Sequence, residues 1–259
     1  MHLLIEAMFY FSGLEFSSLT LQNAALFLAG GRNKHGKLIV ATPNVNHVMR
    51  ARNSIDYHNM LKQMDFLFAD GMPIVWTSRL MGRALPERVT GADLLPAISS
   101  VLNGRNGTIF LAGATSEEEL KKAKENLEIK YPQLTIKTFF PNYGFEISEK
   151  ESMKLIKAIK DSSADVIFLG VGSPKQEKWL LEYKHKLPNG VYIGCGMAIG
   201  FISKTVKRAP KFIQKIGCEW IWRILQEPRR LILRYLLDLG FILVATKEIV
   251  IASIKSLGS

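Results

Sequence analysis

Residues 66–76 read Phe-Leu-Phe-Ala-Asp-Gly-Met-Pro-Ile-Val-Trp, and this stretch decides which fold the chain adopts. The apolar run Phe66–Ala69 is expected to be a buried strand that ends at Asp70. Gly71 lets the backbone turn sharply, and Pro73 suits the first turn of a helix. A strand that leads into a helix is the unit of a parallel α/β sheet, which binds ligands beyond the carboxyl ends of its strands. Asp70 is therefore a candidate catalytic group, although an Asp in this position more often caps the following helix.

The same alternation of strand-like and helix-like segments continues through residues 1–204. It predicts an α/β fold with a mostly parallel, Rossmann-like sheet flanked by helices. After the second strand we expect a helix that ends near Gln63. The expected strands are Met8–Phe16, Lys37–Ala41, Phe66–Ala69, Thr108–Ala112, Leu134–Phe139, Ala164–Leu169 and Val191–Cys195.

The end of the chain has a different character. Two amphipathic helices are expected, over Lys207–Leu225 and Arg229–Ile254, hinged at Pro228. Residues 201–259 contain eleven Lys and Arg but four acids, so they hold +7 of the total formal charge of +11. Such a basic balance indicates an anionic partner, such as nucleic acid, an anionic membrane or a phosphorylated substrate. We therefore predict a catalytic α/β domain over 1–204 and a helical appendage over 205–259 that associates with membranes.

Cysteine usage and hydropathy indicate the compartment. Two cysteines, Cys195 and Cys218, are too few for a disulfide framework in a chain of 259 residues, so a reducing, cytoplasmic setting is expected. The N-terminus lacks a basic segment followed by a long apolar run, so no signal peptide is predicted. The most apolar C-terminal stretch, Leu231–Ile254, contains four charged residues, which favours lying on a membrane or against another helix over crossing a membrane.

Polar and glycine residues follow several of the expected strands. Taken alone, each is more often a turn or a cap, but together they fall on the edge of the sheet where such folds bind ligands. The turns at Gly113–Ala114 and Gly172 lead directly into helices, whose free N–H groups suit a phosphate. Neither turn has the spacing of a P-loop or of a dinucleotide fingerprint. Together the two turns indicate a site for a nucleotide diphosphate, but they do not identify the nucleotide. The candidates at this edge are Thr42, Asn44, Asp70, Gly113, Ala114, Gly172, Gln176 and Gly196.

A resident metal is not expected. The five histidines are scattered without ligand spacing, and the chain has no Asp-x-Asp sequence that could hold a metal diphosphate. Positive charge for a diphosphate leaving group would then come from Arg, Lys and backbone N–H groups. Arg88, in the polar loop before the fourth helix, is one candidate, and its alternative role is that of a solvated loop arginine.

Eight short motifs occur in a fixed order and resemble the WecG/TagA/CpsF family of bacterial glycosyltransferases, glycosyltransferase family 26. The resemblance covers about residues 10–240. The Asp-Gly, Gly-x-Pro-x-Gln-Glu and Glu-Pro-x-Arg elements are specific in combination, although each is short. The motifs are Thr42–Asn44, Ala69–Gly71, Glu87–Asp93, Gly170–Glu177, Gly194–Gly200, Arg208–Pro210, Glu219–Arg223 and Gln226–Arg230.

The resemblance implies an inverting, metal-independent transfer of N-acetylmannosamine or a related hexose from a UDP-sugar. The acceptor would be a polyprenyl-diphosphate-linked sugar at the inner face of the cell membrane, in the synthesis of cell-wall or surface polysaccharide. The family's general base falls on Asp70. Its Thr and Asn near the sugar fall on Thr42 and Asn44, and its motif arginine and glutamine on Arg88 and Gln176. Appendage arginines that could bind the diphosphate are Arg223, Arg229, Arg230 and Arg234.

Two other functions remain open from the sequence. A basic nucleic-acid-binding protein would account for the charge and the mixed Trp and Arg residues of the appendage, but no nucleic-acid-binding motif is present. A dinucleotide-dependent oxidoreductase would account for the fold, but the fingerprint is incomplete. We expect UDP-sugar, lipid-linked acceptor and anionic membrane as partners, no nucleic acid, and a possible homo-oligomer.

Overall fold

The computed structural model describes residues 8–30, 36–215 and 217–257. Its centre is a six-stranded sheet with the order β4-β3-β8-β7-β5-β6, in which every pairing is parallel. The predicted α/β class with a parallel sheet is thus confirmed. The strands are β3 (Lys37–Ala41), β4 (Phe66–Leu67), β5 (Thr108–Gly113), β6 (Thr135–Phe139), β7 (Val166–Gly170) and β8 (Gly190–Gly194).

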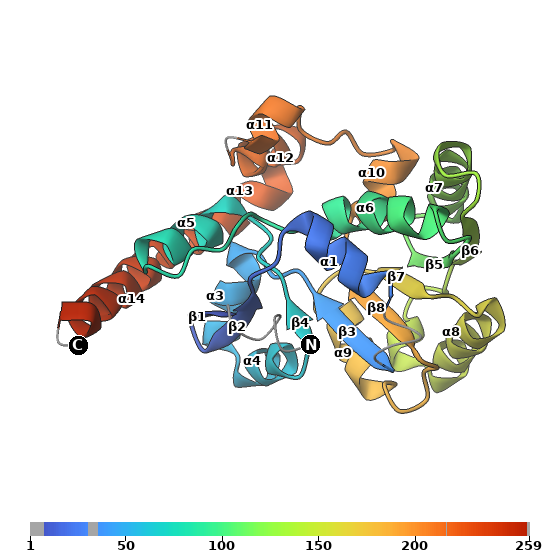
Figure 1. Ribbon diagram of the computed structural model, residues 1–259, viewed down its shortest axis with the longest axis horizontal. Coiled ribbons are helices and arrows are strands. Elements are labelled where there is room, and N and C mark those ends of the chain that lie inside the picture. The colour runs from blue at the N-terminus through green and yellow to red at the C-terminus, as the bar shows by residue number, and fades with distance from the viewer. Residues whose placement is uncertain (1–7, 31–35, 216, 258–259) are drawn as a thin grey trace.

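Helices cover both faces of this sheet (Figure 1). Along β7, Ile167 and Leu169 belong to one buried cluster, with side chains of α3, α4, α8 and α9. Val166 and Phe168 belong to the other, with side chains of α1, α6, α7 and α10. Strands buried on both faces read as continuous apolar runs, as these do. The helices are α1 (Leu21–Leu28), α3 (Val45–Asn53), α4 (Ile55–Lys62), α5 (Met72–Leu80), α6 (Gly91–Asn103), α7 (Glu117–Lys130), α8 (Glu149–Ser162), α9 (Lys175–Glu182) and α10 (Ala198–Ser203), with a short 3₁₀ helix η2 (Phe145–Ile147).

The first strand was predicted as one continuous strand over Met8–Phe16, and this prediction is wrong. Its residues make an antiparallel hairpin, β1 (Met8–Phe11) and β2 (Leu14–Ser17), which is a separate two-stranded sheet. Ser12 and Gly13 form the turn with φ of 52° and 73°. Two consecutive positive φ angles are typical of the tight hairpin turn that matches strand twist.

The helix predicted to end near Gln63 is two helices, because the chain breaks at Ser54. This residue is extended, with φ −140° and ψ 111°, and is both the last cap of α3 and the first cap of α4. Its hydroxyl accepts a hydrogen bond from the Tyr57 N–H. Ser favours such caps because its side chain replaces a missing helical partner.

The described residues of the appendage form four helices where two were predicted. They are α11 (Lys211–Lys215), α12 (Glu219–Gln226), α13 (Pro228–Asp238) and α14 (Gly240–Leu257). The break at Pro228 was expected, since Pro fits the first position of a helix and not its interior. The extra breaks fall near Gly217, whose φ is +75°, and between Asp238 and Gly240.

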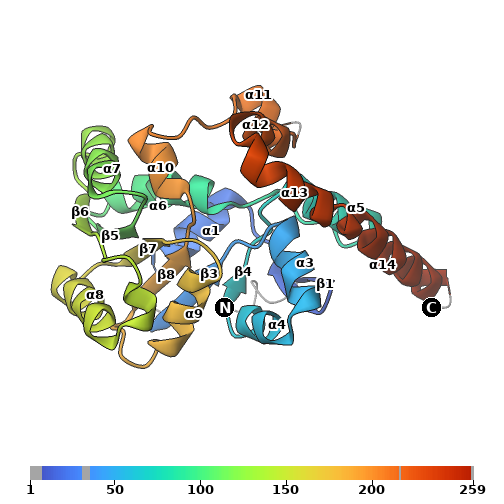
Figure 2. The ribbon, with the colours of Figure 1, turned by 180° about the vertical axis from the view of Figure 1, so that it is seen from behind.

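The appendage packs on the α/β part through α3 and α5, as both views show (Figures 1 and 2). Leu231, Phe241 and Ala245 are buried there. On the same face of α14 as Phe241 and Ala245, the Glu248 carboxylate accepts hydrogen bonds from the Ser12 N–H and hydroxyl, at 3.0 and 3.1 Å. Among the described residues, no helix is long and apolar enough to span a membrane. The domain boundary near residue 204 remains a prediction.

Candidate active site

The strand order brings four predicted strand ends together. Because β8 lies between β3 and β7, and β4 pairs with β3, the loops after these four strands are neighbours. They carry Thr42, Asp70, Gly172 and Gly196, and all four residues line one polar cavity of about 340 Å³. The candidate site is therefore built at the carboxyl edge of the sheet, where α/β folds bind ligands.

The backbone of Asp70 is held in place by a hydrogen bond, whereas its carboxylate makes none with the described residues. Its N–H donates to the Pro43 carbonyl at 3.0 Å, beside the end of β3. The N-cap of α5 is Gly71, with φ +133°, and no side chain caps this helix. Within the described residues no hydrogen bond reaches the Asp70 carboxylate. Asp70 therefore does not cap α5, which is the role that its position in the sequence favours. Its side chain lines both cavities instead.

Burial raises the pKa of Asp70 from 3.8 to about 6. The nearby Arg88 opposes this shift, while the carboxylates of Glu219 and Asp93 add to it. Low-dielectric surroundings disfavour a charged carboxylate, which is why burial has this sign. A carboxyl group with a pKa near neutrality is suited to accept a proton during catalysis.

Two glycines leave open space at the wall of the polar cavity. Gly172 and Gly196 have φ of +82° and +51°, and a Cβ at either position would meet nothing within 4 Å. Both therefore let a ligand approach the backbone closely. Thr42 and Asn44 line the same cavity. Asn44 also begins α3, where its side chain accepts from the His47 N–H at 3.3 Å.

Gln176 braces this wall. Its carbonyl oxygen accepts from the Gly196 N–H at 3.2 Å, and its amide donates to the Glu177 carboxylate at 2.8 Å. The side chain is buried and lies under Gly194, where a Cβ would approach Gln176 Nε2 to 2.6 Å. Gln176 thus holds the ligand-facing turn in place.

Gly113 and Ala114 line neither of the two cavities described here. Gly113 ends β5 and Ala114 follows it, and this strand is separated from β8 by β7. A Cβ on Gly113 would lie 2.7 Å from Val171 and 2.9 Å from the backbone of Gly170, so close strand packing explains this glycine. The Ala114 N–H donates to the Gly170 carbonyl at 3.2 Å. Their predicted phosphate contact stays a prediction.

Arg50, Tyr57 and Glu177 line the polar cavity and are among the lining residues that were not predicted as site residues. The Arg50 guanidinium lies over the Tyr57 ring, 5.3 Å from its centroid. Among the described residues, Arg50 Nη1 and Glu177 Oε2 are buried without a hydrogen-bond partner. Burial raises the pKa of Glu177. Unpaired buried polar atoms are unfavourable, so Arg50 Nη1 is placed to donate a hydrogen bond to a ligand and Glu177 Oε2 to accept one.

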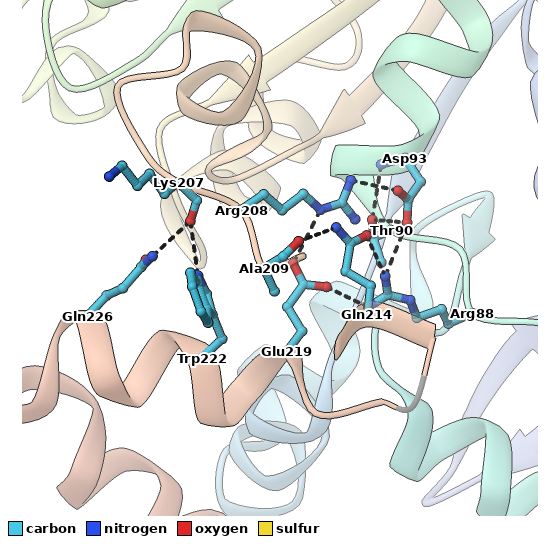
Figure 3. A network of polar contacts seen from close by, with 10 residues as sticks. All are labelled: Arg88, Thr90, Asp93, Lys207, Arg208, Ala209, Gln214, Glu219, Trp222 and Gln226. Atoms are coloured by element: carbon cyan, nitrogen blue, oxygen red, sulfur yellow. Dashed lines mark hydrogen bonds and ion pairs between the residues drawn. The ribbon is translucent and has the colours of Figure 1, made fainter. Parts of the chain in front are cut away.

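Arg88 is part of an ion-pair network that joins the α/β part to the appendage (Figure 3). Arg88 Nη1 donates to Glu219 Oε2 at 2.7 Å, and Nη2 lies 3.8 Å from Asp93 Oδ2. Arg208 Nη1 pairs with Asp93 Oδ1 at 2.7 Å, and its Nε donates to Glu219 Oε1 at 3.2 Å. The four side chains are mostly buried. Arg88 is therefore not a solvated loop arginine, and we call this network the latch.

The predicted appendage arginines lie at different places. Arg223 lines both cavities, and its Nη2 lies 3.2 Å from the Met197 sulfur. The side chains of Arg230 and Arg234 lie outside the described residues, so their predicted roles are not located. Arg229 is exposed.

A second cavity, of about 520 Å³, adjoins the polar one and is mostly apolar. One wall is α5, with Pro73, Trp76 and Leu80. The facing wall belongs to the appendage and includes Ile242 and Ile249. The two cavities share the residues Asn44, Asn46, Asp70, Ala92, Phe201 and Arg223. Asp70 therefore stands where a polar and an apolar space meet, and we call the second the apolar groove.

Other reactive groups in the cavity have a different character. Burial raises the pKa of the Cys195 thiol to about 12, so it is a poor nucleophile.

Within the described residues, no three His, Cys, Asp or Glu side chains gather as a metal site. The absence of a required metal stays a prediction.

Comparison with known proteins identifies the family. The family model described as "Glycosyl transferase WecG/TagA/CpsF family" matches residues 9–254. The chain therefore belongs to the WecG/TagA/CpsF family of glycosyltransferases. This confirms the predicted family and enzyme class. The comparisons support neither a nucleic-acid-binding protein nor a dinucleotide-dependent oxidoreductase.

Three relatives have the printed name N-acetylglucosaminyldiphosphoundecaprenol N-acetyl-beta-D-mannosaminyltransferase. One, from Bacillus subtilis strain 168, is 29% identical over 192 residues, covering 74% of this chain and 73% of the relative. Another, from Staphylococcus aureus strain MW2, is 28% identical over 223 residues and 85% of each chain. A third, from Bacillus spizizenii strain W23, is 28% identical over 199 residues, covering 77% of this chain and 74% of the relative.

Proposed function

We propose that this glycosyltransferase moves N-acetylmannosamine or a related hexose from a UDP-sugar to a polyprenyl-diphosphate-linked sugar. One observation carries the proposal: the partly buried Asp70 carboxylate, with a pKa of about 6, stands between a polar cavity and an apolar groove. The polar cavity suits a sugar, and the groove suits the lipid part of an acceptor. The names of the relatives support the same pair of substrates.

Asp70 acts as the general base in this mechanism. It takes the proton from an acceptor hydroxyl while that oxygen attacks the anomeric carbon of the donor. The bond from this carbon to the β-phosphate oxygen breaks, UDP leaves with the electron pair, and the configuration inverts. A positioned base of this kind accelerates proton transfer by about 10²–10⁴-fold. The open carboxylate and its shifted pKa support the assignment.

The donor's hexose occupies the polar cavity, where hydroxyl and amide groups can be recognised. Arg50 Nη1 can donate a hydrogen bond to it, and Glu177 Oε2 can accept one. Thr42 and Asn44 line the same space from the end of β3. Correct orientation matters because small displacements of the reacting atoms greatly slow the reaction.

The leaving diphosphate requires positive charge. Arg223 lines both cavities beside Asp70, and Arg88 lines the groove. A guanidinium has five N–H donors, so Arg88 can keep its contact with Glu219 and still donate to a phosphate oxygen. The open backbone at Gly172 and Gly196 offers further close contacts. Preorganised donors of this kind stabilise charge without a metal.

The test of the base is the substitution Asp70→Asn. It keeps the side chain's shape but removes its ability to accept a proton, so UDP binding by calorimetry should stay within about threefold of wild type. Transfer should fall by about 10²-fold or more, the contribution expected of a general base. Asp56→Asn, an exposed residue near the start of α4, is the matched control and should behave as wild type. Near-normal transfer by Asp70→Asn would exclude the base assignment.

The proposed setting is the cytoplasmic face of the membrane, with the protein bound peripherally. The +7 charge of residues 201–259 supports this, because Lys and Arg near an anionic leaflet each contribute about 1 kcal/mol. Exposed apolar side chains of the appendage, such as Phe212, Leu225 and Leu243, support it as well. Oligomeric state is a separate proposal, and light scattering in solution would determine it.

A further inference from the structure

The apolar groove has walls from two parts of the chain. On the side of α5, Trp76 and Leu80 are 43% and 67% exposed, and on the side of α14, Ile242 is 61% exposed. Large apolar side chains that gather around one cavity and remain open to solvent mark a binding surface. The volume of about 520 Å³ lies in the usual range of small-molecule sites.

The groove begins at the catalytic carboxylate and leads away from the sheet. Asp70 and Arg223 line it at one end, where it meets the polar cavity. Towards its other end it is lined by Phe241, Ala245 and Ile249 of α14, the helix that extends from the body of the molecule (Figure 1). At 1.5 Å per residue, these positions extend over about 12 Å of the helix.

The lining of the groove combines polar and apolar parts. Asp70 and Arg223 also line the polar cavity, whereas Arg88 and Arg208, paired with Glu219, line the groove only. Apolar side chains of α5 and α14 make up most of the remaining lining. A molecule that places a sugar at Asp70 and a diphosphate at the arginines must place whatever follows the diphosphate in the groove.

We propose that the groove between α5 and α14 binds the first isoprene units of the acceptor's polyprenyl chain. The proposal rests on the proposed function and deepens it, because it assigns a protein site to the lipid and not only to the sugar and diphosphate. Continuity with Asp70 favours this occupant over a membrane acyl chain or a second copy, neither of which has a reason to reach the catalytic carboxylate. The latch holds the appendage against the α/β part, because Glu219 of α12 pairs with Arg88 in the loop before α6.

The test measures how strongly transfer depends on chain length, in solution without vesicles. Two acceptors carry the same N-acetylglucosamine diphosphate, one esterified to a methyl group and one to a farnesyl group. For the wild type, kcat/KM should be about tenfold or more higher with the farnesyl acceptor, because burying two methylene-sized groups already has an effect of that order.

Two substitutions probe the walls, each with a matched control. Thr246 is exposed and lines the groove, so Thr246→Trp should fill it and reduce the farnesyl preference to about twofold or less, by loss of the buried area. Ile251→Trp, on an exposed part of the same helix away from the groove, should keep the preference. On the other wall, Leu80→Ser should raise KM for the farnesyl acceptor, and Leu26→Ser, 45% exposed on α1, should not.

The possible outcomes separate the explanations. No farnesyl preference in the wild type, or an equal preference in Thr246→Trp, would overturn the proposal. Loss of vesicle binding by Thr246→Trp with an unchanged preference would assign the groove to membrane lipid, and a change of oligomeric state would assign it to a second copy. If UDP-sugar is transferred to neither acceptor, the proposed function itself fails, which is a different result.

Discussion

Asp70 combines two properties that a general base requires. Its backbone is held between loops by the hydrogen bond from its N–H to Pro43, while its carboxylate receives no hydrogen bond from the described residues. Its pKa lies about two above the ordinary value, close enough to neutral pH for proton transfer in either direction. Burial raises the pKa of this carboxyl group, which suits catalysis. The same burial lowers the stability of the folded state when the group is ionised.

The first consequence concerns activity. Because the base must be ionised, kcat/KM should fall about tenfold for each pH unit below about 6, and should level off above it. The profile is measured between pH 4.5 and 8 with saturating UDP-sugar and with the lipid acceptor well below its KM, so that kcat/KM reports the acceptor-free enzyme. A profile that is flat across pH 6 would contradict the role of Asp70, provided that Asp56→Asn shows the wild-type curve.

The same ionisation affects stability. Asp70 releases its proton near 3.8 when unfolded and near 6 when folded, so the unfolded state is favoured increasingly as pH rises between these values. Replacing the carboxyl by Asn removes this effect. Asp70→Asn should therefore increase the free energy of unfolding by up to about 3 kcal/mol at pH 8, and should gain little at pH 3.5. Denaturant unfolding at the two pH values measures the difference.

Some site residues could be predicted from the sequence and others could not. Thr42, Asn44, Asp70 and Gln176 follow apolar runs, so their place at the strand ends is evident from the sequence. Arg50 lies at the centre of a helical segment without a motif, and it reaches the cavity only because of how α3 packs. Glu177 had a signal, its position beside Gln176 in a motif, but its burial with an unpaired oxygen required the structure.

At the scale of elements, the latch determines how the appendage meets the catalytic edge. Glu219, at the start of α12, contacts Arg88 and Arg208, and Asp93, in the first turn of α6, contacts the same two arginines. Removing one member of a mostly buried ion-pair network leaves its partners without compensation, which is strongly unfavourable. Glu219 also raises the pKa of Asp70, so the latch connects the appendage to the base.

We expect Glu219→Gln to have two measurable effects. The free energy of unfolding should fall by about 2–4 kcal/mol, as for breaking a buried pair. The acid limb of the pH–rate profile should move to lower pH, because a carboxylate that raises the pKa of Asp70 is lost. Glu128→Gln is the control, since its pair with Lys124 is exposed and such pairs contribute about 1 kcal/mol or less. A destabilised variant with an unmoved profile would mean that the latch is structural only.

The elements that were wrongly predicted share a physical cause. The turn at Ser12–Gly13 and the break at Ser54 each depend on one or two residues inside longer apolar or helical patterns. Periodicity over a window of residues averages such positions out. Gly217 is similar: a Cβ there would lie 2.7 Å from Met72, a contact that no local pattern reveals. The sheet itself was predictable because its strands are buried on both faces and bounded by turns.

At the scale of the molecule, the uneven charge predicts how the protein meets a membrane. Binding to vesicles containing phosphatidylglycerol should fall about tenfold or more between 0.1 and 1 M NaCl, since the screening length shortens from about 10 to 3 Å. Lys211→Glu combined with Arg229→Glu should weaken binding at low salt, because both residues are exposed on the appendage. Lys122→Glu combined with Lys124→Glu, on α7, is the matched control. Equal loss in both double variants would mean that only net charge matters.

The latch also has a consequence for the order in which the chain is made. Arg88 and Glu219 are separated by 131 positions in the sequence. At about 5–20 residues per second, roughly 7–26 s of synthesis pass between them. The strands whose ends build the polar cavity are complete once Gly194 is made, whereas most of the appendage wall of the groove follows Glu219. On the proposed function, the strand ends that hold the sugar are therefore made before the groove that holds the lipid.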